Sequence, residues 1–226
     1  MIISVHVPKA AGNSFRECLA AKFGERLLSV YGDWAGCDLP AANERYARRT
    51  GEMRERGPEL MLKYDIIHGH FAADRFVGVF PSADYVAFFR DPYQQALAHY
   101  YFLLRNPQRD HPEERILHDE KMSLHDYLEW SAFRNHQTQY LGSVSIEDLA
   151  MVGLSCEFGK SLTAFRTIFG VDLDEERFCN VNPASAGAYS ITPEVKRLID
   201  KHRAADLELY RRAVEIFKKQ SAAVAA

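Results

Sequence analysis

Residues 9–14, Lys-Ala-Ala-Gly-Asn-Ser, combine an ammonium group, a glycine and a hydroxyl in one short stretch of this 226-residue sequence. Residues 1–6 before it are apolar and β-branched, which is typical of a buried strand. Residues 15–23 after it carry apolar side chains at helical spacing. The pattern predicts a strand, a tight loop and a helix, with Asn13 and Ser14 as helix-start residues.

A loop of this kind can bind a phosphate or sulfate group. Gly12 allows the backbone to approach a ligand closely, and the N–H groups at a helix start attract anions. Lys9 adds a full charge and Ser14 a hydroxyl donor. The loop is not a Walker A motif, because the lysine of that motif directly follows its second glycine, whereas Lys9 precedes Gly12 by three positions. The alternative is an ordinary turn with a surface lysine.

The His68-Gly69-His70 sequence ends a second strand, predicted over residues 64–71. Open α/β sheets bind ligands at the carboxyl ends of their strands, so a histidine there is well placed for function. Packing or capping is the alternative for either histidine, but a pair around a glycine favours function. Metal binding is the weaker interpretation, because no carboxylate or cysteine lies at ligand spacing.

Arg90 ends a third strand, predicted over residues 84–90, and Pro92 suits the first turn of a helix over residues 93–104. An arginine at a strand end can hold a phosphate group through two parallel hydrogen bonds. The alternative is a structural ion pair with Asp91 or another carboxylate.

The rest of the chain supplies the elements that must position these residues. A loop is predicted over residues 25–39, a basic helix with paired surface charges over residues 41–63, and irregular chain over residues 106–122. The later predicted elements are a helix capped by Ser123, a polar helix over 133–141, strands over 149–154 and 178–183, a helix over 158–169, and a last helix opened by Thr192 and Pro193.

Length and composition fit one α/β domain spanning residues 1–226, with a frayed tail from residue 221. The formal net charge of −3 argues against a nucleic-acid-binding protein, which would be strongly basic. Four widely spaced cysteines predict neither a zinc site nor a disulfide framework. No run reaches the length of a transmembrane helix, and the first strand begins too early for a signal peptide. We therefore expect a soluble, cytoplasmic protein.

Taken together and in order, these stretches resemble the sulfotransferases that use 3′-phosphoadenosine 5′-phosphosulfate (PAPS) as donor. Residues 8–15 resemble the loop that holds the 5′-phosphosulfate, and residues 88–102 resemble the segment that holds the 3′-phosphate. Residues 67–70, Ile-His-Gly-His, are similar to the His-Gly-His of uronyl and heparan sulfate 2-O-sulfotransferases. Three further stretches resemble bacterial, cytosolic members of that branch: residues 135–138, 180–183 and 206–210.

The resemblance implies a three-layer α/β/α fold with a central parallel sheet, related to P-loop nucleotide kinases. It implies PAPS as donor, PAP as product, and an acceptor hydroxyl on a saccharide or small metabolite. It implies no need for a metal. The net charge and the lack of a long apolar run, not the resemblance, predict no nucleic-acid partner and no membrane span.

The resemblance also assigns roles to residues. Lys9 would contact the 5′-phosphate and the bridging oxygen, and Arg90 would hold the 3′-phosphate. His70 would accept the proton of the acceptor hydroxyl, and His68 would help to position the acceptor or the sulfuryl group. The other implied donor-binding positions are Ala11, Gly12, Asn13, Ser14 and Phe15 in the first loop, Ala98 in the 3′-phosphate segment, and Asn182 and Ser185 in a loop over residues 182–189 that would close over the donor.

The sequence departs from the family pattern at two positions of the 3′-phosphate segment. Gln95 stands where a second arginine is usual, and Ala98 stands where a serine is usual. The loss of the serine hydroxyl predicts a weaker contact with the 3′-phosphate. Two other functions stay open at this point: a non-catalytic nucleotide- or carbohydrate-binding relative, and a kinase-like phosphotransferase.

Overall fold

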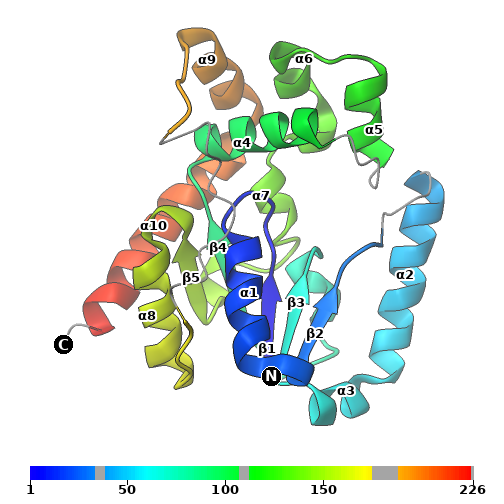
Figure 1. Ribbon diagram of the computed structural model, residues 1–226, viewed down its shortest axis with the longest axis vertical. Coiled ribbons are helices and arrows are strands. Elements are labelled where there is room, and N and C mark those ends of the chain that lie inside the picture. The colour runs from blue at the N-terminus through cyan, green and yellow to red at the C-terminus, as the bar shows by residue number, and fades with distance from the viewer. Residues whose placement is uncertain (34–38, 107–111, 175–187, 225–226) are drawn as a thin grey trace.

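The computed structural model describes residues 1–33, 39–106, 112–174 and 188–224, and in these residues five parallel strands form one sheet. The order across the sheet is β2-β3-β1-β4-β5. The strands are β1 (Ile2–Val5), β2 (Leu27–Val30), β3 (Ile66–Gly69), β4 (Asp84–Phe89) and β5 (Met151–Leu154). Figure 1 shows the sheet in the middle of the molecule, with helices on both of its faces.

Ten α-helices lie in the described residues. They are α1 (Gly12–Phe23), α2 (Leu39–Glu55), α3 (Gly57–Lys63), α4 (Pro92–Arg105), α5 (Pro112–Asp119), α6 (Leu124–Glu129), α7 (His136–Gln139), α8 (Phe158–Phe169), α9 (Pro193–His202) and α10 (Ala204–Val224). Short 3₁₀ helices connect several of them, including η2 (Ala73–Phe76) and η4 (Ile146–Asp148).

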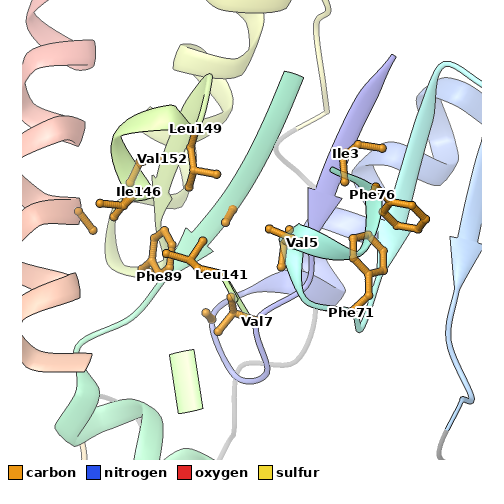
Figure 2. Packing of buried hydrophobic residues seen from close by; sticks show 14 of the residues in the cluster. Ile3, Val5, Val7, Phe71, Phe76, Phe89, Leu141, Ile146, Leu149 and Val152 are labelled. Atoms are coloured by element: carbon orange, nitrogen blue, oxygen red, sulfur yellow. The ribbon is translucent and has the colours of Figure 1, made fainter. Parts of the chain in front are cut away.

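Alternate residues of each strand pack on opposite faces of the sheet, which is the ordinary periodicity of a strand. On one face, Ile2 belongs to a buried apolar cluster that includes Phe15 of α1 and Phe165 of α8. On the other face, Ile3 belongs to a cluster that includes Phe217 of α10. Figure 2 shows this second cluster, in which residues from β1, β4 and β5 meet residues from η2 and η4. The predicted three-layer α/β/α fold with a central parallel sheet is thus confirmed.

A third apolar cluster joins α4, α6 and α9 beyond the sheet. Its buried residues include Leu97 of α4, Leu128 of α6 and Ile199 of α9. These helices group with α5 at one end of the molecule in Figure 1. They form a helical layer beyond the carboxyl end of β4, where the chain enters α4.

Four sequence-based predictions of secondary structure were wrong. Residues 25–39 contain strand β2 at the edge of the sheet, where only Val30 is buried and the apolar signal is weak. The single helix predicted over residues 41–63 is two helices, because Pro58 occupies the first turn of α3. The irregular stretch over 106–122 contains α5, and the last helix is divided into α9 and α10 at Arg203. The strand predicted over 178–183 lies outside the described residues.

Candidate active site

The loop between β1 and α1 turns through two residues in the left-handed region of backbone conformation. Lys9 has a φ of 62° and Ala11 a φ of 70°. A non-glycine residue in this region costs on the order of 1–3 kcal/mol and persists only where its surroundings hold it. The chain therefore carries backbone strain at the position where the sequence predicted an anion-binding loop.

Helix α1 begins at Gly12, before Asn13 and Ser14, the residues that the sequence predicted as its start. Its N-cap is Ala11, which makes no side-chain cap hydrogen bond, so Asn13 and Ser14 lie inside the first turn instead of capping it. The first N–H groups of a helix have no partner within the helix and form the positive end of its dipole. With no side chain capping them, they are suited to bind an anion.

Phe15 differs from the other residues predicted in this loop. Its amide donates to the carbonyl of Ala11 at 3.0 Å. Its ring is buried against Phe88 and Phe165, with ring centroids 4.7 and 5.5 Å away. Phe15 therefore anchors α1 to the sheet, and its side chain does not face the anion-binding end of the helix. The Ser14 side chain is buried as well.

Lys9 is half-buried, and its ammonium nitrogen lies 4.0 Å from the centre of the Phe102 ring. Burial lowers the pKa of Lys9 to about 8, and the positive charges of Arg90 and Arg105 add to that shift. Bringing an anion to the ammonium group would offset both effects.

Arg90 follows β4 directly and reaches the same loop. Its Nη1 atom donates to the carbonyl oxygen of Lys9 at 3.2 Å. Its amide donates to the side-chain oxygen of Gln137 at 2.9 Å, and its carbonyl accepts from Gln137 Nε2 at 2.8 Å. Burial lowers the pKa of the guanidinium group.

Neither Lys9 nor Arg90 forms an ion pair with a carboxylate in the part of the chain that the structure describes. Asp91, the partner considered from the sequence, instead accepts a hydrogen bond from the amide of Gln94 and caps α4. Two half-buried cations thus lie near each other with no ion-pair partner among the described residues, an electrostatic setting that suits an anion.

One face of α4 lies against the loop. Gln95 is buried and donates through Nε2 to the carbonyl of Pro8 at 3.1 Å. Ala98 and Phe102 follow on the same face, at helical spacings of three and seven residues. Ala98 is 3% exposed, and its methyl group offers no hydrogen-bond donor. Gln95 therefore fixes the loop, a role that the sequence did not reveal.

His70 follows β3 at the same edge of the sheet. Its ring is half-buried, with its centroid 4.2 Å from that of His6 and 5.0 Å from that of Tyr31. The glycine before it is required by the sheet, because a Cβ at Gly69 would lie 1.9 Å from the carbonyl oxygen of Val30 in β2. The His-Gly-His sequence thus places His68 inside the sheet and His70 just beyond the carboxyl end of β3.

His68 is the interior histidine and is 1% exposed. Its Nδ1 atom lies 2.8 Å from the hydroxyl of Ser4. Burial lowers the pKa of His68 to about 3, and the charges of His70 and Arg16 add to the shift. The resemblance implies that His68 helps to position the acceptor or the sulfuryl group, and at this burial its ring would do so from inside the sheet.

The order of the strands places these residues at a topological switch point. After β1 the chain turns toward β2 on one side, and after β4 it turns toward β5 on the other, while β1 and β4 are neighbours. Ligands of open α/β sheets bind in the crevice outside such a point. The Lys9 loop follows β1, and Arg90 follows β4.

A second layer of contacts supports Arg90. Asp206 of α10 accepts hydrogen bonds from the amides of Gln137 and Thr138, at 3.1 and 2.8 Å. In return, Asn135 Oδ1 accepts from the amides of Ala205 and Asp206 at the start of α10. The starts of α7 and α10 therefore cap each other and hold Gln137 against Arg90. In the sequence these residues were noted only as family-like stretches.

The predicted donor-closing residues Asn182 and Ser185 lie outside the described residues. The described end of that loop contacts α4. Gln94 Nε2 donates to the carbonyl of Tyr189 at 3.0 Å, the Tyr189 amide donates back at 2.6 Å, and the rings of Tyr189 and Tyr101 stack at 5.4 Å.

In the described residues, no group of three or more histidine, cysteine or acidic side chains is arranged to hold a metal ion. None of the helices described has the length and apolar character needed to cross a bilayer.

The fold and the site together define a parallel α/β protein with a strand, a strained loop and a helix at the switch point of its sheet. No protein-family model and no curated protein matches the sequence. Among solved structures, the chain is similar to a sulfotransferase from Alicyclobacillus acidocaldarius, with 16% sequence identity and a TM-score of 0.45. The match covers 92% of this chain and 94% of the other.

Proposed function

We propose that this protein is a sulfotransferase that moves the sulfuryl group of PAPS to an acceptor hydroxyl. The observation that carries the proposal is the meeting of Lys9, Arg90 and the uncapped start of α1 at the switch point of the sheet. These groups suit a donor with two separate phosphates. A histidine ring, His70, lies at the same edge and can act on a hydroxyl group.

In this proposal the first-turn amides of α1 and Lys9 bind the 5′-phosphate, and Arg90 binds the 3′-phosphate. Lys9 also neutralises the negative charge that develops on the oxygen between phosphorus and sulfur, as the bond from that oxygen to sulfur breaks. These binding groups are held in place before the ligand arrives. Gln95 donates a hydrogen bond to the Lys9 loop, and Gln137 both accepts from the Arg90 amide and donates to the Arg90 carbonyl.

Sulfuryl transfer resembles phosphoryl transfer, with in-line attack and charge spread over the equatorial and leaving oxygens. The acceptor oxygen forms a bond to sulfur while the bond from sulfur to the bridging oxygen breaks, and PAP leaves. The hydroxyl proton goes to His70, which acts as general base. The His-Gly-His sequence favours a member of the 2-O-sulfotransferase branch, and a saccharide or small metabolite as acceptor.

Radiolabelled PAPS, offered with a panel of saccharides and small hydroxyl compounds, tests the proposal. We expect His70→Ala to lower kcat by about 10²–10⁴-fold with PAP binding retained, since base catalysis is worth that much. Lys9→Ala should lower turnover with little effect on melting. His125→Ala is the control, because His125 is exposed and contacts Glu194 and Glu129 away from the site.

Three results would contradict the assignment. A Lys9→Ala variant with unchanged melting and the wild-type rate would remove Lys9 from the mechanism. Loss of activity in His68→Ala but not in His70→Ala would show that His68 is the base. Transfer from ATP instead of PAPS would indicate a kinase-like protein.

A further inference from the structure

A third histidine, His6, lies behind His70 and was not predicted to take part in the site. It follows β1, and its amide donates to the carbonyl of Gly69 at 2.8 Å, so its backbone extends the pairing of β1 with β3. Its ring is 4% exposed. The ring stacks on His68 with a centroid distance of 5.2 Å and meets His70 edge-on at 4.2 Å.

Two neighbours fix the orientation of the His6 ring. Its Nδ1 atom lies 2.8 Å from the hydroxyl of Tyr31, the residue that follows β2. Its opposite edge lies against α1, because a Cβ at Gly12 would be 1.9 Å from His6 Cδ2 and 2.2 Å from Nε2. Gly12 is therefore required by the His6 ring. The ring connects the anion-binding start of α1 with the imidazole of His70.

The charge state of His6 suits this position. Its pKa lies well below the ordinary value, first because the ring is buried and then because of the charges that face it from His70, His68, Arg16 and Lys9. Tyr31, its hydrogen-bond partner, has a raised pKa owing to burial and stays a neutral hydroxyl. A neutral ring beside His70 adds no charge that would oppose the uptake of a proton there.

We propose that His6 and Tyr31 are positioning residues for His70. The Tyr31 hydroxyl fixes the His6 ring, and the His6 ring holds the His70 imidazole at a set distance from the start of α1. The inference rests on the proposed function in one respect, since it takes His70 to be the general base. The claim that Tyr31 and His6 fix the position of the His70 ring does not depend on that function.

The chain contains a matched control. His99 Nδ1 lies 2.9 Å from the hydroxyl of Tyr127, and both residues are buried in the helical layer. Tyr31→Phe and Tyr127→Phe thus each remove a tyrosine hydroxyl from the Nδ1 atom of a buried histidine, and Tyr31→Phe also removes the contact of that hydroxyl with Arg16. The first pair lies against His70, with the ring centroids of His6 and Tyr31 at 4.2 and 5.0 Å from that of His70, and the second pair lies in the helical layer.

The experiment measures kcat, KM, PAP affinity and melting of wild type, Tyr31→Phe and Tyr127→Phe, and the nuclear Overhauser effect between the ring protons of His6 and His70. We expect Tyr31→Phe to lower kcat by about 10–100-fold with KM and PAP affinity nearly unchanged, because small displacements of a catalytic group are costly. The Overhauser effect should weaken in Tyr31→Phe and persist in Tyr127→Phe. In a His70→Ala background, Tyr31→Phe should lower kcat no further.

The outcomes separate the two proposals. If wild type uses PAPS but Tyr31→Phe behaves like Tyr127→Phe in both kcat and ring contact, the positioning role is wrong and the sulfotransferase proposal stands. If wild type neither binds PAP nor uses PAPS, the proposed function fails. In that case an Overhauser effect lost only in Tyr31→Phe would still support the positioning of His70, and one retained in Tyr31→Phe would overturn it.

Discussion

Lys9 is held where an ammonium group is poorly solvated, between an aromatic ring and two arginines. Phe102 contributes a favourable cation–π contact, but burial and the charge of Arg90 both disfavour the protonated form. An ordinary surface lysine would be solvated or paired. A phosphate group that binds beside Lys9 would therefore stabilise its protonated form more than it would stabilise that of a solvated or paired lysine.

The lowered pKa of Lys9 predicts a pH dependence of PAP binding. Below pH 8 the ammonium group is charged, and as the pH rises through about 8 the free protein loses that proton. The affinity for PAP should therefore fall above pH 8, by at most about tenfold per pH unit. Calorimetric titrations between pH 6.5 and 9.5 measure it, with the range chosen to bracket the pKa of about 8.

Lys9→Met is the control for this titration. It should bind PAP more weakly and with no fall above pH 8, because the titrating group is gone. Parallel curves for wild type and Lys9→Met would mean that Lys9 does not bind the nucleotide.

The sequence predicts the candidate site residues at strand ends more readily than the residues that hold those side chains in position. His70 and Arg90 were placed correctly at strand ends, because a polar residue after a buried apolar run is a local signal. The contact of Gln95 with Pro8 joins positions 87 residues apart, and no local pattern marks it. The buried His6 ring was likewise hidden, since a histidine beside a strand usually has no such partner.

At the scale of elements, the edge strand β2 sets the requirement for a glycine between the two histidines. Gly69 faces the carbonyl of Val30 at a distance that leaves no space for a Cβ. The sequence contained the glycine, but its reason was hidden because β2 itself was not predicted. The division of the predicted helix over residues 41–63 was missed although Pro58 marks it.

Two glycine substitutions should change stability in opposite directions. Gly69→Ala should destabilise the protein, because the new methyl group overlaps the Val30 backbone and pushes β2 from β3. Gly51→Ala should stabilise it by about 0.4–1 kcal/mol, because Gly51 lies inside α2 with open space around it. Thermal or urea unfolding of both variants measures this. A Gly69→Ala variant as stable as wild type would contradict the pairing of β2 with β3.

The mutual capping of α7 and α10 predicts an effect of Asp206 on both stability and nucleotide binding. Asp206→Ala removes the acceptor of the Gln137 and Thr138 amides and of the Thr138 hydroxyl. A loss of at least about 1.5–3 kcal/mol is expected, the usual worth of one hydrogen bond to a charged group. PAP affinity should fall as well, because Gln137 holds the backbone of Arg90.

Asp200→Ala is the matched control, as Asp200 forms an exposed ion pair with Lys196 on α9. Exposed pairs of this kind contribute about 0–1 kcal/mol. Unfolding and calorimetry on both variants give the comparison. Equal losses of stability, or unchanged PAP affinity in Asp206→Ala, would contradict the role of the α7 support.

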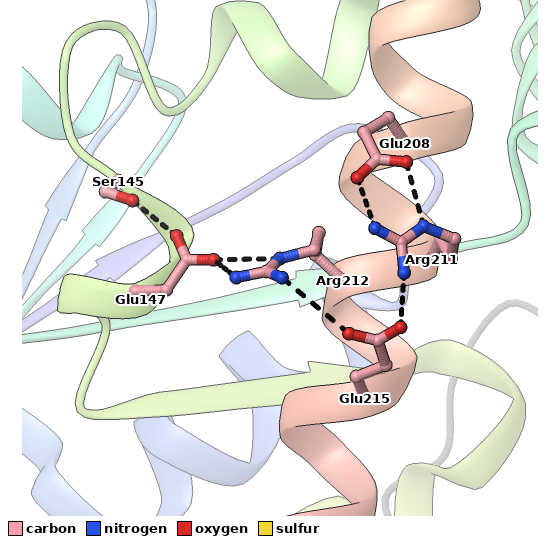
Figure 3. Close-up of polar contacts among 6 residues, drawn as sticks. All are labelled: Ser145, Glu147, Glu208, Arg211, Arg212 and Glu215. Atoms are coloured by element: carbon pink, nitrogen blue, oxygen red, sulfur yellow. Dashed lines mark hydrogen bonds and ion pairs between the residues drawn. The ribbon is translucent and has the colours of Figure 1, made fainter.

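At the scale of the whole molecule, many arginines form ion pairs with nearby carboxylates. Figure 3 shows Arg211 and Arg212 of α10 bound to Glu208, Glu215 and Glu147, which ties α10 to η4. The overall charge is −3, so the protein as a whole would not attract an anion. Among the described residues, Lys9 and Arg90 form no ion pair with a carboxylate, although both are half-buried.

The fold as a whole was predictable, because strand, loop and helix signals recur in the order that a parallel sheet requires. The strand order was not, since it depends on contacts between β1 and strands 60 or more residues away, such as the pairing of Ile2 with Ile66. That order is what brings the Lys9 loop next to Arg90. The site is thus a property of the topology as much as of the residues.

The measurement that tests the central claim most directly is a calorimetric comparison of PAP with adenosine 5′-phosphosulfate, which lacks the 3′-phosphate. Wild type should prefer PAP, by about 10-fold or more, because Arg90 adds a charge-assisted hydrogen bond to the 3′-phosphate worth roughly 1.5–3 kcal/mol. Arg90→Ala should bind the two nucleotides about equally. Equal affinity for both in wild type would mean that the 3′-phosphate is not recognised, and would contradict the assignment of PAPS as donor.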